Sequence, residues 1–293
     1  MSRFQIGFSL VEIMLSLTLG LIISAAALVL LFAVQRSFTL QQSTADIQEN
    51  AHFSLNFITK DLRLANLQAP STIMTNDSLH GGIVLSTANL SSTDQTETRY
   101  LSQSTVAASS NVNVGSDQLV IQYRPVKSGG YDCEGREITS TSDYVIQRYF
   151  IRKDSNYDAS DTASTALALA CDAGRNTGTT TSNFGDSGQI VMKRVDYFHV
   201  LLTVQNSVGQ FRDMTISEYQ QSARDGRILG VKIGILTRVN VADKRQNEGA
   251  AVATFQILDQ SITLNRALTE RKNQFKHQVI IQSIAMRNAL GEV

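Results

Sequence analysis

The sequence predicts an α+β protein in which one long N-terminal α-helix packs on an antiparallel β-sheet domain. Three observations support this prediction. The chain begins with an apolar run of membrane length from Gly7 to Val34, and apolar residues then recur at helical spacing as far as Ala65. After Pro70, segments rich in β-branched and aromatic residues alternate with polar loops.

Composition narrows the classes of function. The 293 residues include 26 Lys plus Arg and 26 Asp plus Glu, so the formal net charge is zero. A balanced charge creates no overall field that would attract nucleic acid or an anionic membrane surface, and we expect no direct nucleic-acid partner. Beyond the apolar N-terminus, the chain is long enough for one large domain or two small ones.

The apolar run predicts a single membrane-spanning helix over residues 8–34. At 1.5 Å per residue such a helix is about 40 Å long, more than the ~30 Å hydrocarbon core of a bilayer. Arg3 and the terminal amine favour a cytoplasmic N-terminus, which places the rest of the chain in the periplasm. A secretory signal peptide cleaved after residues 25–27, which are all alanine, is an alternative, but the apolar run continues beyond them.

Glu12 is the only charged residue of that run. A carboxylate inside a membrane-spanning helix costs about 2.5 to 3.5 kcal/mol on translocon scales, so its presence needs an explanation. A plain membrane anchor, the second alternative, gives this carboxylate no purpose.

The stretch GFSLVE at positions 7–12 stands behind a very short leader and resembles the class III signal of type IV pilins and the related pseudopilins. The resemblance implies that a prepilin peptidase removes residues 1–7 between Gly7 and Phe8, and that Phe8 is then N-methylated. It also implies that Glu12 neutralises the Phe8 amine of a neighbouring subunit in the dry core of a filament. An unpaired charge of either sign would be costly there.

The helix is predicted to continue through residues 35–68 as an amphipathic half. Pro70 marks its expected end near Leu67, because the residue before a proline is pushed out of the helical region. Gly20 is a weak point, at about 1 kcal/mol relative to alanine, and no proline interrupts the apolar half as it does in many type IV pilins. One apolar stripe at spacings of three and four predicts the face that packs on the sheet: Ile47, Ala51, Leu55, Ile58, Leu62 and Ala65.

Residues 70–293 are predicted to form the β-sheet domain in the periplasm. Strands that follow one another without intervening helices favour antiparallel pairing. The strand candidates are GGIVLST, DQLVIQYR, YVIQRYFIRK, QIVMKRVDYFHVLLTVQ with a possible internal break, ILGVKIGILTRVNV and AVATFQIL.

Cys133 and Cys171 are the only cysteines. In the oxidising periplasm they are expected to form one disulfide, stabilising by about 3 to 4 kcal/mol in the chain-entropy model; two buried free thiols are the alternative. Their spacing does not suggest redox chemistry. Residues 154–188 between and beyond them are the least periodic part of the chain and are predicted to be a long surface loop.

Three further motifs have simpler interpretations. GDSG at 185–188 matches the nucleophile motif of chymotrypsin-like proteases but fits a polar turn equally well, and no histidine stands in that family's context. The acidic run at 154–161 lacks the Gly and Glu of an EF-hand. The basic C-terminal run with Arg271, Lys272, Lys276 and Arg287 is expected to be a solvated face. The sequence therefore predicts no catalytic residue, no metal site, no cofactor and no enzyme activity.

The C-terminal region is similar to the end of PilW-type minor pilins in its FKHQV segment and closing AMRNAL. This resemblance implies a minor type IV pilin that is held in the inner membrane and then built into the pilus, where it primes or caps assembly. Its implied partners are other minor and major pilins, the prepilin peptidase and the inner-membrane assembly platform. A type II secretion pseudopilin of the J type and a membrane-anchored adhesin that never polymerises remain alternatives.

Overall fold

The computed structural model describes residues 9–90, 98–106, 110–178, 180–240, 253–270 and 275–291, without the side chains of Leu40 and Ser43. Contacts divide the chain into two compact units, Met1–Ala45 and Asp46–Val293, and the second is called the head below. Helix α1 (Leu10–Leu64) is continuous through both units.

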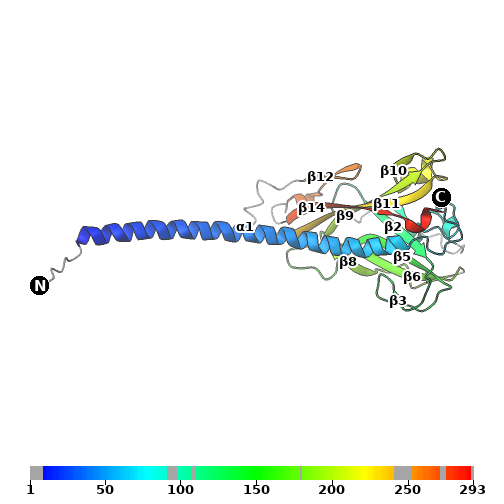
Figure 1. Cartoon of the computed structure of the whole chain (residues 1–293), viewed down its shortest axis with the longest axis horizontal. Helices are drawn as coiled ribbons and strands as arrows, with labels where there is room; N and C mark the ends of the chain where they lie inside the picture. Colours follow the sequence, from blue (N-terminus) through cyan, green and yellow to red (C-terminus); the bar gives the residue numbers. More distant parts are fainter. Residues whose placement is uncertain are drawn as a thin grey trace, which may run out of the picture. The chain divides into compact units, whose positions relative to one another are not determined.

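The head consists of two main antiparallel sheets and two small hairpins (Figure 1). The first sheet has the strand order β1-β2-β5-β6-β7, with β8 also paired to β6, and comprises β1 (Gln103–Val106), β2 (Ser116–Tyr123), β5 (Tyr144–Lys153), β6 (Leu167–Asn176), β7 (Thr181–Ser182) and β8 (Gln189–Lys193). The second has the order β10-β9-β11-β14 and comprises β9 (Val195–Gln205), β10 (Phe211–Thr215), β11 (Arg227–Asn240) and β14 (Phe275–Ala285).

The remaining elements are short. The hairpins are β3 (Gly130–Tyr131) with β4 (Glu137–Ile138), and β12 (Thr254–Ile257) with β13 (Gln260–Thr263); the short helices are α2 (Ile216–Ser222), α3 (Arg266–Thr269) and the 3₁₀ turns η1 (Thr87–Asn89), η2 (Thr98–Tyr100) and η5 (Arg287–Ala289). This architecture confirms the predicted α+β class, a long N-terminal helix followed by antiparallel sheets.

The predicted apolar stripe of α1 lies in the core of the head. All six of its residues are buried, from Ile47 at 4 % exposed to Ala65 at 0 %. Five of them, Ala51 to Ala65, belong to one apolar cluster that takes Tyr149 and Leu169 from the first sheet and Val200 and Ile233 from the second. The helix therefore joins the two sheets, since both bury side chains against the same stripe.

Helix α1 ends at Leu64, a turn before the end predicted from Pro70. Asn66 adopts a left-handed backbone with φ 66°, a conformation that asparagine tolerates better than most residues. Its side-chain oxygen accepts the Gly82 amide at 2.9 Å, which fixes that conformation. The C-terminal end of α1 is thus set by a tertiary contact of Asn66, which the sequence pattern does not reveal.

The strand predictions succeed for β2, β5 and β11, and the predicted break inside QIVMKRVDYFHVLLTVQ is real. Arg194, with φ 58°, separates β8 from β9 at the point where the chain passes from the first sheet to the second. The predicted strand GGIVLST is wrong: Ile83 makes only an isolated bridge to Ile121. The side-chain oxygen of Asn89 accepts a hydrogen bond from the Leu85 amide at 2.8 Å, and the backbone turns away from the sheet.

The predicted loop 154–188 is also wrong in its middle part. Residues Leu167–Asn176 form β6, a ten-residue strand between β5 and β8 that is almost wholly buried. Its sequence, LALACDAGRN, is rich in residues with low strand propensity and shows no alternation because both faces are covered.

Candidate functional site

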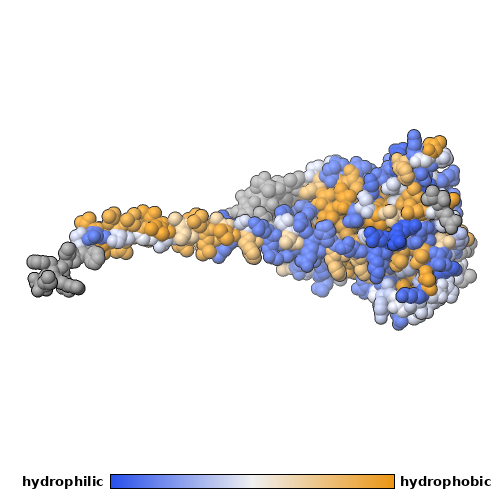
Figure 2. All heavy atoms as spheres, viewed as in Figure 1, coloured by the Kyte–Doolittle hydropathy of each residue, from blue (hydrophilic) through white to orange (hydrophobic). Residues whose placement is uncertain are grey.

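The first part of α1 is the most unusual surface in the chain. Its large apolar side chains are exposed from Leu10, at 75 %, to Val34, at 65 %. Figure 2 shows apolar atoms along this part of the helix. By length and composition, α1 is the one helix among the described residues that could cross a membrane. Such a surface requires a nonpolar environment, either lipid or other helices.

Glu12 lies in the first turn of α1, where Ser9 caps the helix. The Glu12 amide donates to the Ser9 side-chain oxygen at 3.2 Å and to the Ser9 carbonyl oxygen at 3.1 Å. A carboxylate in the first helical turn is favoured by the helix dipole. The S-x-x-E spacing is a capping-box signal that sequence reasoning missed. Glu12 therefore has an electrostatic role within its own helix as well as the one predicted between subunits.

Four residues spaced by four follow one line along this helix: Glu12, Ser16, Gly20 and Ser24. Ser16 donates its hydroxyl to the Glu12 carbonyl oxygen, and Ser24 donates to the Gly20 carbonyl oxygen at 2.8 Å. The hydroxyls are thus satisfied inside the helix, as an apolar environment demands. Apart from its two neighbours and the backbone of its own helix, no atom of the described residues lies within 4 Å of the place where a Cβ of Gly20 would stand, so packing among these residues does not require this glycine.

The second half of α1 carries a buried carboxylate into the head. Tyr149 on β5 donates its hydroxyl to Asp61 at 2.6 Å, and Asp61 is 5 % exposed. Burial raises the pKa of Asp61 to about 6, although the Tyr149 hydrogen bond and the Lys60 charge oppose the shift. This buried pair joins the helix to the first sheet and adds a group that titrates near neutral pH.

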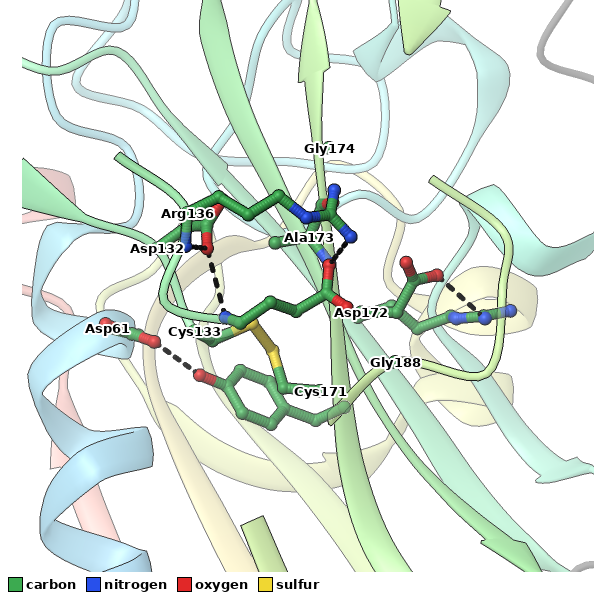
Figure 3. The surroundings of a disulfide bond; sticks show 12 residues. Asp61, Asp132, Cys133, Arg136, Cys171, Asp172, Ala173, Gly174 and Gly188 are labelled. Atoms are coloured by element: carbon green, nitrogen blue, oxygen red, sulfur yellow. Dashed lines mark hydrogen bonds and ion pairs between the residues drawn. A yellow bond between two sulfur atoms is a disulfide. The ribbon is translucent and has the colours of Figure 1, made fainter. Parts of the chain in front are cut away.

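Cys133 and Cys171 form a disulfide, with their Cα atoms 6.1 Å apart (Figure 3). Cys171 is fully buried on β6, in the same cluster as the helix stripe. Cys133 lies in a tight turn in which the Asp132 side chain accepts the amides of Glu134 at 3.0 Å and Arg136 at 2.9 Å. The bond therefore fastens a surface turn to the centre of the core, and Figure 3 shows Asp61 and Asp132 close to it.

Beside the disulfide lies an acidic group that sequence reasoning missed. One oxygen each of Glu134, Asp172 and Asp186 lies within 4.8 Å of the others, a spacing that could hold a metal ion. Two of these carboxylates already form ion pairs with arginines: Glu134 with Arg136, and Asp172 with Arg148 at 2.8 Å. Burial raises the pKa of Asp172 to about 6. The arrangement is that of an ion-pair network.

The acidic run at 154–161 is neutralised in the same way. Asp158 and Asp161 accept hydrogen bonds from Arg194 at 2.7 and 2.8 Å, and Asp161 also binds the buried Arg238 at 2.8 Å. Asp154 lies 3.3 Å from Lys193. These carboxylates face guanidinium and ammonium groups of the chain, so their charges are compensated within the head.

The GDSG motif forms a turn. Gly185 and Gly188 have φ of 101° and 58°, and a Cβ on Gly188 would lie 2.3 Å from the Cys171 carbonyl oxygen. Asp172 accepts the Gly185 amide at 2.8 Å, which holds the turn against β6. Ser187 is exposed, and no hydrogen bond in the described part of the chain connects it to a histidine.

The remaining predicted residues lie outside the described part of the chain. These are Arg3, Gly7 and Phe8 of the leader and cleavage site, and Arg271 and Lys272 of the basic C-terminal run. Lys276 stands in β14 and Arg287 in η5.

Comparison with known proteins adds one observation. No protein-family profile and no curated protein sequence matches this chain. Among solved structures, the chain is similar to a type IV-like pilin from Thermus thermophilus, with 8 % sequence identity and a TM-score of 0.41 over 83 % of this chain and 98 % of that one. At this level of likeness, fold and function rest on the residues described above.

Proposed function

We propose that the protein is a minor type IV pilin, a structural subunit that is cleaved and N-methylated and then primes or caps pilus assembly. One observation carries the proposal. A single 55-residue helix has an exposed apolar first part whose only charge is Glu12, and its second part is built into the core of a sheet domain. A subunit that moves from a bilayer into a helical bundle needs both parts.

Gly20 supports helix-to-helix packing as the use of the apolar part. Glycine destabilises a helix by about 1 kcal/mol relative to alanine, and among the described residues no atom beyond its own helix backbone and chain neighbours lies within 4 Å of where its Cβ would stand. Small residues at spacings of four allow two helices to approach closely in an apolar environment, and Ser16, Gly20 and Ser24 have that spacing. The partners proposed for this face are the apolar helices of other minor and major pilins.

Glu12 has the roles of registry residue and first-turn helix anion in this proposal. After cleavage between Gly7 and Phe8, the methylated amine of a neighbouring subunit's first residue is the cation that Glu12 neutralises. A buried charge pair costs least when both members are present, so subunits that are out of register are disfavoured. The prepilin peptidase and the inner-membrane assembly platform act on the subunit before it enters the pilus.

The first test is the mass of the N-terminal peptide, measured on protein from membranes and from sheared surface fibres. A peptide that starts at N-methylated Phe8 in both fractions is the expected result. A start at Met1 would indicate an unprocessed anchor, and a start at Leu28 a secreted protein; either would overturn the proposal. A processed peptide without surface fibres would favour a secretion pseudopilin.

The second test separates the two roles of Glu12. Glu12→Ala is expected to block incorporation into fibres while leaving cleavage largely intact, and normal piliation at normal protein level would contradict the registry role. Ser9→Ala is the matched control because it removes the helix cap but keeps the carboxylate. If Ser9→Ala reduced incorporation as strongly, capping of α1 would explain the effect.

A further inference from the structure

A buried histidine joins three parts of the head. His199 on β9 is fully buried. Its Nδ1 lies 2.7 Å from Asp117 on β2, and its Nε2 lies 2.8 Å from Asp259, in the turn between β12 and β13. The imidazole thus connects the first sheet, the second sheet and the β12–β13 hairpin.

The geometry requires a proton on each ring nitrogen. Asp117 also accepts the amides of Thr105 at 2.9 Å and Val200 at 2.8 Å, so both of its oxygens act as acceptors and the contact with His199 is a hydrogen bond donated by Nδ1–H. A neutral imidazole with that tautomer would present the lone pair of Nε2 to the Asp259 carboxylate. Two acceptors repel each other at 2.8 Å, so the contact is favourable only when a proton lies between them.

The charges around His199 act in the same direction. Burial lowers the pKa of His199, but the hydrogen bonds and charges of Asp117 and Asp259 outweigh it and raise the pKa above its ordinary value. Tyr197 on the same strand stacks at 5.9 Å between ring centroids and carries no charge at neutral pH. From β11, the residue opposite His199 is Gly234, which has no side chain.

Asp259 is the movable partner. It is 46 % exposed on its side chain, whereas Asp117 is 2 % exposed. Water can therefore solvate Asp259 if its contact with His199 is lost. The preceding residue, Leu258, is held at φ 53°, a left-handed conformation that is unfavourable for leucine and that an opened turn could relax.

The hairpin that Asp259 fastens covers apolar surface. Ile257 and Ile262 are fully buried in a second apolar cluster with Tyr197 and Leu236. A Cβ on Gly234 would lie 2.5 Å from Ile257, so the hairpin rests directly on β11 at this glycine. At its other end the hairpin is held by Asn113, whose side-chain oxygen accepts the Thr263 amide at 2.8 Å. Release of Asp259 can therefore occur while the hairpin stays attached through Asn113 and through Gln260, whose side-chain oxygen accepts the Tyr197 hydroxyl at 2.5 Å.

We propose that His199 is a pH-dependent clasp: the imidazolium holds the β12–β13 hairpin closed through Asp259, and loss of its Nε2 proton releases the turn and exposes the apolar surface beneath. Because the closed state binds the proton more tightly than the open state, closure is complete below the open-state pKa of His199. It is lost as the pH rises through the closed-state pKa. This inference does not depend on the proposed pilus function.

The test is amide hydrogen exchange of the full chain in detergent micelles between pH 5.5 and 9.5, corrected for the intrinsic exchange rate. Protection of the peptide covering 254–263 should fall by up to about tenfold for each pH unit between the two pKa values of His199. Protection of β9 and β11 should not change. The titration of His199 is followed in parallel by imidazole NMR signals.

Two variants make the result specific. In Asp259→Asn the side-chain amide can donate to an unprotonated Nε2, so the hairpin should stay protected at every pH and the step should disappear. Asp213→Asn, a matched change in the exposed pair with Lys232, should keep the step. Constant hairpin protection in the wild-type protein, whether or not His199 titrates, would overturn the proposal. A step that persists in Asp259→Asn would overturn it as well.

Discussion

Asn288, in the C-terminal segment, caps the C-terminal end of helix α1. Its side-chain amide donates to the carbonyl oxygens of Arg63 and Ala65, each at 3.0 Å, and its own carbonyl oxygen accepts the Asn66 side chain at 3.0 Å. The last carbonyls of a helix have no partner within the helix, so a distant residue satisfies them here. The end of α1 is therefore completed only when the C-terminal segment is in place.

The first prediction follows from this contact. Asn288→Ala leaves the carbonyl oxygens of Arg63 and Ala65 without their donor and should lower the free energy of unfolding by about 1 to 3 kcal/mol. Asn288→Asp should destabilise more, because it brings a negative charge to the negative end of the helix dipole. Urea unfolding of the detergent-solubilised chain measures both. Ser283→Ala, at an exposed position of β14, should have little effect, and an equal loss there would refute the assignment.

The second prediction concerns Asp61 and pH. Its folded pKa of about 6 lies above the ordinary value of 3.8, so the folded state holds a proton that the unfolded state releases between these values. Its contribution to stability therefore falls as the pH rises through this range, by about 3 kcal/mol in total. Asp61→Asn, which keeps an acceptor for Tyr149, should be progressively more stable than the wild type from pH 3.5 to 7.

The difference between the two proteins isolates Asp61 from other buried groups. Burial lowers the pKa of His277 to about 3, which makes stability rise with pH over part of the same range, but His277 is common to both proteins. Urea midpoints at half-unit intervals of pH would measure the difference. If it were the same at pH 3.5 and pH 7, Asp61 would have an ordinary pKa in the folded state.

The third prediction concerns the disulfide. Replacing Cys133 and Cys171 together by alanine should lower the free energy of unfolding by about 3 to 4 kcal/mol, because the cross-link no longer restricts the unfolded chain. Alanine is the appropriate replacement because Cys171 is fully buried and a serine hydroxyl would lack a partner there. Reducing agent should destabilise the wild type by a similar amount and leave the double variant unchanged. Sensitivity of the double variant to reducing agent would contradict this account.

Sequence pattern was sufficient to predict the helix stripe and the strands β2, β5 and β11. The stripe from Ile47 to Ala65 alternates with polar residues at helical spacing, and β11 alternates at the period of a strand, so each pattern has a single physical interpretation. Strand β6 could not be found in this way. Both of its faces are covered, as in β2, but its sequence has few of the β-branched and aromatic residues that identify β2 as a strand.

Contacts between distant residues were the other limit. Asn66 and Asn288 are 222 positions apart, and His199 meets Asp117 and Asp259 across 82 and 60 positions. No local pattern marks such pairs, because their chemistry arises only when the strands are assembled. The proposed site, in contrast, could be predicted from local sequence. Glu12 and the apolar run were visible from the sequence alone, since membrane length and an isolated charge are local properties. The cap by Ser9 was equally local and could have been found from its spacing.

The fourth prediction tests the face of α1 that contains Gly20. Among the described residues, a Cβ at position 20 meets open space, so Gly20→Leu should leave the head folded and the precursor inserted in the membrane normally. Leucine also forms helix better than glycine, so the isolated helix should gain stability, by roughly 0.5 to 1 kcal/mol. Only a partner that approaches within a few ångströms of Gly20 would be obstructed. We therefore expect a strong loss of incorporation into fibres with an unchanged membrane level, measured by immunoblots of sheared and membrane fractions.

Leu19→Ile, which alters the adjacent exposed position without adding volume, is the control. Normal incorporation of Gly20→Leu would mean that this face looks onto lipid in the assembled state, and the close-packing role of the Ser16, Gly20 and Ser24 line would have to be abandoned.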